Sequence, residues 1–288
     1  MCVNNDNITY VFILGKHRSG TTWLSNVLLN SHDISSVIDE GFHRGICESS
    51  LYSHFFPYVD KLGLTLEKQI ELYSNSRYFL CSGADKSCLD NIKTRKDFIK
   101  VVASQLCRKN NTNIFLEKTP AHSLKIREII SDFPNAKFLV IKRNMIDVAE
   151  SSFARFEEYK TFTSKIRFGF VYNSYYKLID YQLKDKNSNS MFVNYEDLNE
   201  HFSDIFEFVN VSRFTDSISH FKKKSSQNIK SKKLSHIDIF ALNSGVVLSY
   251  LMPSFFISYL SSKRDKLLGR DLPYFFYGTD NVDPYSHL

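Results

Sequence analysis

The sequence has few of the residues that mark specialised classes of protein. It holds five cysteines, at Cys2, Cys47, Cys81, Cys88 and Cys107, an odd and scattered set without a C-x-x-C pair. This pattern argues against a complete disulfide framework and against a zinc site. We therefore expect a reducing compartment, the cytoplasm, and no bound metal.

Long hydrophobic segments are also lacking. Residues 1–7 are polar and carry no basic region ahead of the short apolar run 10–14, so they do not resemble a secretory signal. The most apolar late stretch, residues 246–260, contains Pro253 and is shorter than the roughly 20 residues that span a bilayer. We expect it to be a buried helix, or at most a peripheral contact with a membrane surface.

The composition is that of an ordinary globular protein. Apolar residues make up 43% and charged residues 24% of the chain, which excludes disordered and collagen-like classes. The formal net charge of +6 favours an anionic ligand without indicating a nucleic acid. No repeat, low-complexity tract or Gly/Ser/Pro-rich linker divides the sequence, so we expect one domain over residues 1–288.

Apolar runs followed by helical patterns predict the order of the elements. The runs 10–14, 114–116 and 137–141 are typical of strands buried on both faces, and 191–193 of a further strand. A helix-like spacing follows the first run from Trp23 to Leu28. Strands alternating with helices predict a single α/β domain with a central parallel sheet flanked by helices.

Capping residues predict where three later helices begin. Thr119 is placed as the N-cap and Pro120 as the first residue of the helix after the second run. Asn144 with Asp147 looks like a capping pair for the helix after the third run. Residues 202–209 have the pattern of a short amphipathic helix.

A glycine-bounded loop lies between the first predicted strand and its helix, where backbone N–H groups and a helix N-terminus bind anions. Its two glycines have the separation found in nucleoside-triphosphatases, but Thr21 stands at the lysine position and Arg18 lies inside the loop. The run that ends at Ile141 is followed by no aspartate for magnesium. A nucleotide kinase or NTPase is thus disfavoured, and a non-catalytic nucleotide-binding protein is a second alternative.

Residues 15–24, GKHRSGTTWL, resemble the 5′-phosphosulfate loop of sulfotransferases that use 3′-phosphoadenosine 5′-phosphosulfate (PAPS). Residues 138–151 resemble the 3′-phosphate element of that family, with Arg143 and then Ser151 eight positions on. Residues 117–120, EKTP, and 195–198, YEDL, are similar to segments of bacterial and carbohydrate sulfotransferases. The resemblance implies a P-loop-like core, PAPS as co-substrate and no catalytic metal.

The resemblance also divides the chain into functional segments. It implies a phosphosulfate unit at about residues 8–42 and a 3′-phosphate unit at 112–200. Residues 45–107 match nothing in the family and have no motif, so we expect an acceptor-binding insert of helices and loops. Residues 217–237 contain six lysines and no acidic residue, which indicates either a solvated loop or a basic flap over the cofactor.

The resemblance assigns roles to individual residues. The cofactor contacts it implies are Lys16, His17, Arg18, Ser19, Gly20, Thr21, Thr22, Trp23, Arg143 and Ser151, with the flap residues Lys230, Lys232 and Lys233. Arg18 would stabilise the departing phosphate and Lys118 the sulfuryl group opposite it. The acceptor also needs a general base, for which Glu40 is the first choice and Asp39 or His43 the alternatives.

The sequence thus predicts an enzyme of the PAPS-dependent sulfotransferase class. It would move a sulfuryl group to a hydroxyl, or an amine, of a carbohydrate-like or small-molecule acceptor by in-line displacement, releasing 3′,5′-adenosine bisphosphate (PAP). Arg18 in the loop places the chain closer to the bacterial and carbohydrate enzymes than to the aryl and steroid enzymes. The Asn-, Lys- and Ser-rich composition favours a bacterial source.

Overall fold

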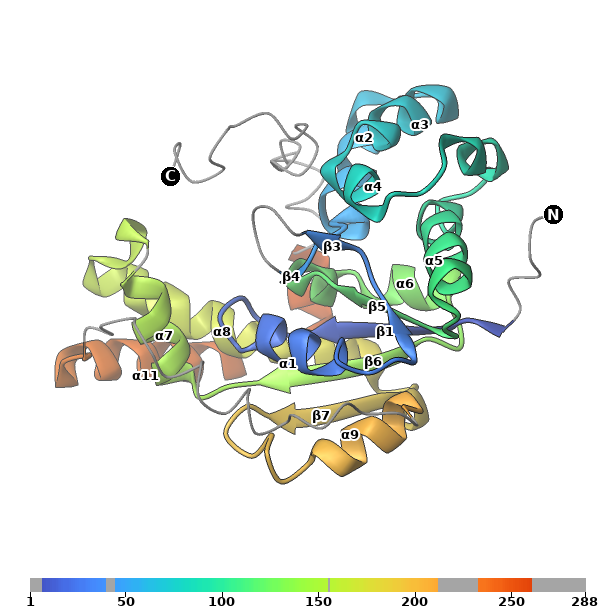
Figure 1. The fold of residues 1–288 in the computed structure, drawn as a ribbon. Helices are drawn as coiled ribbons and strands as arrows, with labels where there is room; N and C mark the ends of the chain where they lie inside the picture. The colour runs from blue at the N-terminus through green and yellow to red at the C-terminus, as the bar shows by residue number, and fades with distance from the viewer. Residues whose placement is uncertain (1–6, 40–44, 155, 212–232, 261–288) are drawn as a thin grey trace.

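A five-stranded sheet forms the centre of the molecule (Figure 1). The computed structural model describes residues 7–39, 45–154, 156–211 and 233–260. The strand order is β2-β5-β1-β6-β7, and every neighbouring pair is parallel. The strands are β1 (Thr9–Leu14), β2 (Ile34–Ser35), β5 (Ile114–Lys118), β6 (Lys137–Lys142) and β7 (Ser190–Asn194). The predicted α/β class with a central parallel sheet is confirmed.

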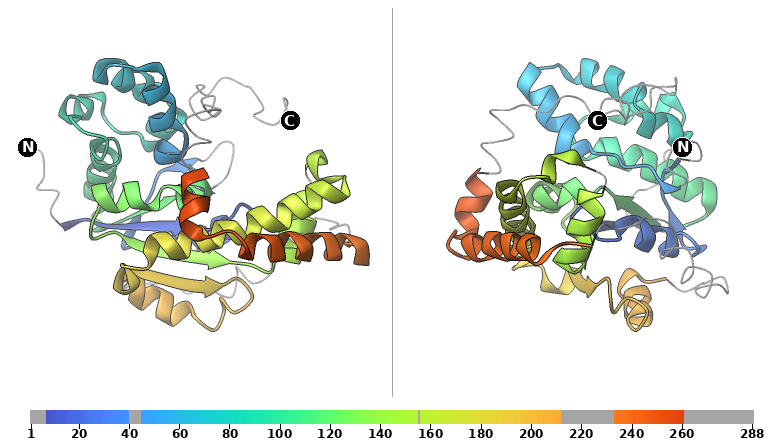
Figure 2. Two further views of the ribbon diagram at one scale, coloured as in Figure 1. Left: turned by 180° about the vertical axis from the view of Figure 1, so that it is seen from behind. Right: turned by 90° about the vertical axis from the view of Figure 1, so that its left-hand side faces the viewer.

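Helices cover both faces of this sheet (Figures 1 and 2). Along β1 the side chains alternate, so Tyr10, Phe12 and Leu14 enter one apolar cluster while Val11 and Ile13 enter the other. The second cluster is completed by α1 (Thr21–Leu28) and α9 (Phe202–Val209). The first is completed by α5 (Asp97–Asn110), α6 (Ile126–Asp132), α7 (Met145–Phe153) and α8 (Phe162–Leu183). Burial on both faces explains why these strands have continuous apolar sequences.

The strand register brings three loops to one edge of the sheet. Ile13 of β1 is paired with Lys118 of β5, and Leu14 with Val140 of β6. The loop at Gly15, the segment after Lys118 and the segment after Lys142 therefore leave the sheet side by side. In open parallel sheets ligands bind at this carboxyl edge.

Residues 45–110 form helices and loops that gather above the sheet in Figure 1, over the range 45–107 for which the sequence predicts an insert. It has an aromatic core in which the Phe98 ring lies 4.9 Å from that of Tyr73 and 5.5 Å from that of Phe55. The short strand β4 pairs antiparallel with β3 outside the main sheet. The elements before α5 are β3 (Ile38–Asp39), β4 (Gly45–Ile46), the π-helical turn η2 (Leu51–Phe55), α2 (Phe56–Leu62), α3 (Leu66–Ser74), α4 (Arg77–Ser82) and the 3-10 turn η3 (Lys86–Asn91). Two other 3-10 turns are η5 (Glu157–Tyr159) and η6 (Asn187–Asn189).

The prediction of a helix that begins at Pro120 is wrong for its first five residues. Residues Pro120–Leu124 form a 3-10 turn, η4, and the α-helix α6 begins only at Ile126. Thr119 does not cap it, because its hydroxyl donates instead to the Glu117 carboxylate at 2.6 Å. The predicted cap at Asn144 is confirmed, since its Oδ1 accepts from the backbone N–H of Ile146 at 2.8 Å.

The apolar stretch 246–260 is not the buried helix that its composition predicts. It is divided between α11 (His236–Tyr250) and a helix at Ser254–Leu260, and the side chains of Val247, Leu251 and Phe255 are 62%, 76% and 63% exposed. Among the described residues, no single helix has the length and hydrophobicity to cross a membrane; these two pass such a test only together, as a pair bent by 102°.

The other face of α11 packs closely on α8. A Cβ atom added to Gly245 would lie 2.0 Å from the carbonyl oxygen of Ile166, and one added to Gly169 would lie 2.0 Å from that of Leu242. Two glycines therefore set the separation of the two helix backbones, which lie side by side in Figure 2.

We predict that Gly245→Ala lowers the free energy of unfolding by about 1–3 kcal/mol, the usual cost of overpacking. Without this contact the substitution would stabilise a helix by up to about 1 kcal/mol. Urea unfolding followed by circular dichroism measures the change, with Asn243→Ala, at an exposed position of the same helix, as the control. If the free energy of unfolding of Gly245→Ala equals or exceeds that of Asn243→Ala, α8 and α11 can move apart without cost.

Candidate active site

The loop after β1 has a backbone that requires glycine at both ends. Gly20 has φ 96°, and a Cβ there would lie 2.4 Å from Cδ2 of the Tyr195 ring. At Gly15 a Cβ would lie 2.6 Å from the carbonyl oxygen of Ile141. Arg18 between them is also left-handed, at φ 72°. The loop therefore turns sharply and passes close to β6.

This loop leads directly into the N-terminus of α1. Gly20 is the N-cap, so it offers no side chain to the free N–H groups of the first turn, and that turn carries no acidic residue. The partial positive charge of the helix end thus remains available. Such an arrangement is a ready site for a phosphate or sulfate group.

The hydroxyl of Tyr176, on α8, holds this loop against the sheet. It donates to the carbonyl oxygen of Ile141 at 3.1 Å and accepts from the backbone N–H of Lys16 at 3.4 Å. Its oxygen is also 2.9 Å from Oγ of Ser19. A second contact comes from Oγ of Ser123, which accepts from the N–H of Gly15 at 3.0 Å. The loop is therefore anchored from behind by α8 and η4.

The loop touches the end of the segment predicted to bind a 3′-phosphate. Nε of Arg18 donates to Oγ of Ser151, on α7, at 2.9 Å. Arg143, at the end of β6, lies 4.5 Å from the centroid of the Tyr195 ring and has its Nε 3.7 Å from an Asp147 oxygen. The structure thus brings together residues from two motifs that are far apart in the sequence.

Not every side chain of the loop faces the same way. Nζ of Lys16 lies 5.1 Å from the centroid of the Phe168 ring and 5.8 Å from that of Tyr175, on α8. Burial there lowers the pKa of Lys16 to about 8. His17 is exposed, whereas Trp23 packs against the rings of Tyr195 and Phe202.

Lys118 is buried at the end of β5 and forms an ion pair with Glu48. Its side chain is 3% exposed, and Nζ lies 2.5 Å from Oε1 of Glu48 and 3.4 Å from Oγ1 of Thr22. An exposed lysine at a strand end, the ordinary alternative, is thereby excluded. A positive charge and a carboxylate therefore stand beside the first turn of α1.

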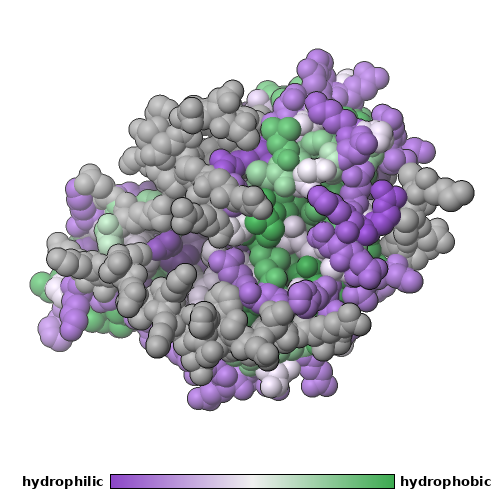
Figure 3. All heavy atoms as spheres, viewed as in Figure 1, coloured by the Kyte–Doolittle hydropathy of each residue, from purple (hydrophilic) through white to green (hydrophobic). Residues whose placement is uncertain are grey.

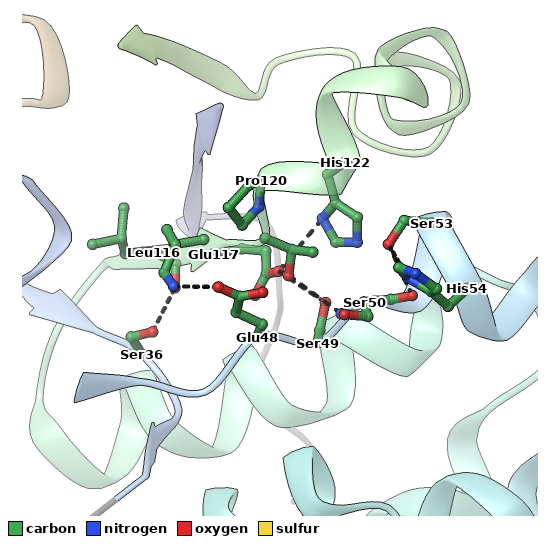
Figure 4. A network of polar contacts seen from close by, with 12 residues as sticks. Ser36, Glu48, Ser49, Ser50, Ser53, His54, Leu116, Glu117, Pro120 and His122 are labelled. Carbon is green, nitrogen blue, oxygen red and sulfur yellow. Dashed lines mark hydrogen bonds and ion pairs between the residues drawn. The ribbon is translucent and has the colours of Figure 1, made fainter. Parts of the chain in front are cut away.

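A buried carboxyl group, that of Glu117, lies next to this ion pair (Figure 4). Oε1 of Glu117 accepts from Oγ of Ser49 at 2.9 Å and from Oγ1 of Thr119 at 2.6 Å. Ser49 follows Glu48 in the chain, and Thr119 follows Lys118. Glu117 therefore ties together the two segments that carry the ion pair. Burial raises its pKa to about 7.

The imidazole of His122 lies beside Glu117 but is not its ionic partner. Nδ1 is 3.4 Å from Oε1 of Glu117, which is within ion-pair distance. However, the ring is fully buried, and this burial lowers the pKa of His122 to about 3. The contact is therefore one between a carboxyl group and a neutral imidazole, packed edge to face with the Tyr52 ring at 5.6 Å.

Comparison with known proteins assigns this arrangement to a family. The profile of the sulfotransferase family matches residues 11–210, more than half of the chain. The chain belongs to the sulfotransferase family. The match ends shortly after α9, so the sulfotransferase region contains the central sheet except for the first two residues of β1, together with the loop at Gly15 and residues 45–110.

Several solved sulfotransferase structures resemble the chain at low sequence identity. The sulfotransferase domain from the curacin biosynthetic pathway has 15% identity, covers 92% of this chain and 99% of its own, and gives a TM-score of 0.47. The sulfotransferase domain from the Synechococcus PCC 7002 olefin synthase has 14% identity, covers 95% of this chain and 99% of its own, and gives a TM-score of 0.46. The sulfotransferase STF9 from Mycobacterium avium has 12% identity, covers 85% of this chain and 76% of its own, and gives a TM-score of 0.48. No curated protein sequence matches the chain.

Some residues predicted for this sulfotransferase site lie outside the described residues: Glu40, His43, Lys230 and Lys232. Lys233 is described and exposed, just before α11. Asp39, an alternative for the base, is 2% exposed and has Oδ2 2.6 Å from Nη2 of Arg77. The Arg77 guanidinium thus holds the Asp39 carboxylate inside the protein, which disfavours Asp39 as the base.

Sequence reasoning missed four residues of the candidate site: Glu48, Ser49, Glu117 and Tyr176. Glu48 and Ser49 contact residues that are distant in the sequence; Glu48 and Lys118, for example, are 70 positions apart. Tyr176 looks like one aromatic among several in α8. For Glu117, the signal in the sequence was the position of the EKTP segment directly after the apolar run 114–116.

We predict that Glu117→Gln raises stability relative to the unmodified chain more at about pH 8 than at about pH 5. The carboxyl pKa is raised from 4.5 to about 7 in the folded state, so its stabilising protonated form is lost as the pH rises through this window. Glutamine keeps the acceptor oxygen and cannot ionise. From about pH 5 to about pH 8, the difference in the free energy of unfolding between the variant and the unmodified chain should grow by about 2 kcal/mol. Urea unfolding measures it.

The matched control for this measurement is Glu71→Gln. Glu71 is a glutamate 61% exposed in its side chain, paired with Lys68 on the surface of α3. Its substitution should show no such growth across the same pH range. A Glu117→Gln difference that is the same at both pH values would mean that the group is ionised throughout.

Proposed function

We propose that this member of the sulfotransferase family transfers a sulfuryl group from PAPS to a hydroxyl, or an amine, of its acceptor. The observation that carries the proposal is the hydrogen bond between Arg18 and Ser151. It joins a loop suited to a 5′-phosphosulfate with a helix suited to a 3′-phosphate. A ligand that carries anionic groups at both positions fits this edge better than ATP does.

The two halves of the site divide the cofactor between them. The N–H groups of the Gly15–Gly20 loop and the start of α1 receive the phosphosulfate, and Arg143 with Ser151 receives the 3′-phosphate. The guanidinium over the Tyr195 ring already has a fixed place and one partly exposed side. Lys230, Lys232 and Lys233 close over the cofactor in this proposal.

The reaction requires stabilisation of charge on the phosphate that departs. The acceptor oxygen forms its bond to sulfur while the bond from sulfur to the phosphate oxygen breaks, so negative charge grows on that oxygen. Arg18, the hydroxyls of Thr21 and Thr22, and the loop N–H groups surround this position. Lys118, held at Thr22 by its contact at 3.4 Å, neutralises the sulfuryl oxygens.

The acceptor proton passes to a carboxylate. Glu40 remains the proposed base. Glu48 is the second candidate, because its side chain is 28% exposed and lies against Lys118 at the same edge of the sheet. His43 is the third, and would give a rate that falls as the pH drops through the imidazole pKa.

The acceptor site is formed by the insert, residues 45–107. Large apolar side chains are exposed there, at Leu62, Leu66 and Leu80. Figure 3 shows an apolar strip across the middle of the face that Figure 1 presents. These features support an acceptor with an apolar part beside its hydroxyl, such as a carbohydrate derivative or another small molecule. The four described cysteines are free thiols, which supports a cytoplasmic location.

Binding of PAP tests the assignment of the 3′-phosphate residues. We predict that Arg143→Ala and Ser151→Ala each weaken binding of PAP by about 10-fold or more, because a charge-assisted hydrogen bond is lost. Binding of adenosine 5′-phosphate should change little, since it lacks the 3′-phosphate. Isothermal titration calorimetry measures both ligands.

The matched control is Ser152→Ala. Ser152 neighbours Ser151 on α7, but its hydroxyl donates to the carbonyl oxygen of Val148 at 2.7 Å within the helix. Its variant should bind PAP normally. Equal losses for PAP and adenosine 5′-phosphate would reject the assignment, and tighter binding of magnesium-ATP than of PAP would favour the kinase or NTPase alternative.

Turnover of the Glu40→Gln variant tests the base. We predict a fall of roughly 10²-fold in kcat with PAP affinity unchanged, because glutamine keeps the size of the side chain but cannot accept the proton. Glu48→Gln and His43→Ala are measured beside it. If Glu40→Gln keeps normal turnover, the variant with the largest loss identifies the base.

A further inference from the structure

Two cysteines lie together beside the site, with a charged pair next to them. The sulfur atoms of Cys47 and Cys81 and a carboxylate oxygen of Asp39 are all within 4.8 Å of one another. Cys47 follows β4 and is buried, whereas Cys81, on α4, is partly exposed. Arg77, one turn before Cys81, forms the ion pair with Asp39 at 2.6 Å. Neither thiol has a part in the proposed sulfuryl transfer.

The groups around the two sulfur atoms give the two thiols different pKa values. The hydrogen bond from the Cys47 thiol lowers the pKa of Cys81, and the Arg77 guanidinium lowers it further, against burial and the charge of Asp39. The same hydrogen bond, together with burial, raises the pKa of Cys47. The sulfur that solvent can reach therefore has thiolate character, and the protected sulfur beside it keeps its proton.

The other two described cysteines lack this environment. Burial raises the pKa of Cys88 to about 11 and also raises that of Cys107, whose Sγ lies 3.8 Å from the carbonyl oxygen of Ile114. Both are therefore matched internal controls for the reactivity of Cys81.

We propose that Cys47 and Cys81 are a redox-sensitive pair that hydroperoxides oxidise reversibly to a disulfide. The Cys81 thiolate attacks one peroxide oxygen, the O–O bond breaks, and with one proton the products are Cys81 sulfenic acid and water or an alcohol. The Cys47 sulfur then attacks the Cys81 sulfur, the S–O bond breaks, and the hydroxyl leaves as water with the Cys47 proton. Two thiols and one peroxide thus give one disulfide, and a dithiol restores the pair.

The disulfide would join the segment after β4 to α4. Cys47 immediately precedes Glu48, and its N–H bonds the carbonyl oxygen of Val37 at 2.8 Å. Oxidation would thus fasten the Glu48 segment to α4. Because Arg77 already supplies the positive charge beside Asp39, a divalent cation would have to displace it to bind here. This inference concerns thiol chemistry and stands whether or not the proposed sulfuryl transfer is correct.

The first experiment measures thiol reactivity in the folded Cys2→Ser chain, which removes the cysteine outside the described residues. We expect iodoacetamide to label Cys81 at least about 10-fold faster than Cys88 or Cys107 near neutral pH, because a larger fraction of Cys81 is thiolate. Peptide mapping by mass spectrometry gives each rate. Labelling of Cys81 at the rate of Cys88 would overturn the proposal.

The second experiment treats the same chain with hydrogen peroxide. We expect a peptide that joins Cys47 to Cys81, with the loss of two hydrogen atoms, reversed by dithiothreitol. In Cys47→Ser, dimedone should trap the sulfenic acid at Cys81, while Cys88→Ser and Cys107→Ser should form the disulfide normally. Absence of the joined peptide from the unmodified pair, or stoichiometric binding of zinc that protects both thiols, would overturn the proposal.

Discussion

The hydroxyl of Tyr176 fixes the shape of the anion-binding loop. It is almost fully buried, and it lies between the loop, through Lys16 and Ser19, and the end of β6, through Ile141. A buried hydroxyl with several partners is costly to disturb, because removing it would leave their polar groups unpaired. The sharp turn at Gly15 and Gly20, and hence the contact of Arg18 with Ser151, depend on this anchor from α8.

A second buried group does the same for the acceptor side. Glu117 holds Ser49 from the insert and Thr119 from the end of β5, so that Glu48 and Lys118 are presented as a pair. Tyr176 acts through its own hydroxyl and Glu117 through the hydroxyls of its two partners, so neither anchor is an ion pair. The Glu48–Lys118 ion pair, whose lysine is buried, is thereby held at the edge of the sheet.

The sequence predicted the parts of the fold whose pattern is local. The buried runs at β1, β5 and β6 and the amphipathic residues of α9 could be recognised, because each element determines its own periodicity. The loop and the residues Arg143 and Ser151 followed from motifs, and the structure brings Arg18 to Ser151.

The remaining features depend on contacts between distant segments. Thr119 has the sequence of a helix cap, but Glu117 takes its hydroxyl. Asp39 looked available as a base until Arg77, 38 positions away, was placed beside it. Glu48 has no local signature at all. In α11 and the following helix, apolar residues surround the axis, so composition alone could not tell the face that packs on α8 from the face that is exposed.

The long helix α8 couples the periphery of the molecule to its centre. Gly169, against which α11 rests, and Tyr176, which holds the anion-binding loop, are seven positions apart on this helix, or about 10 Å along its axis. A helix is stiff over two turns, so a tilt that relieves pressure at one point displaces the other. The shape of the loop between Gly15 and Gly20 thus constrains α11 through α8, and Gly245 has to stay small.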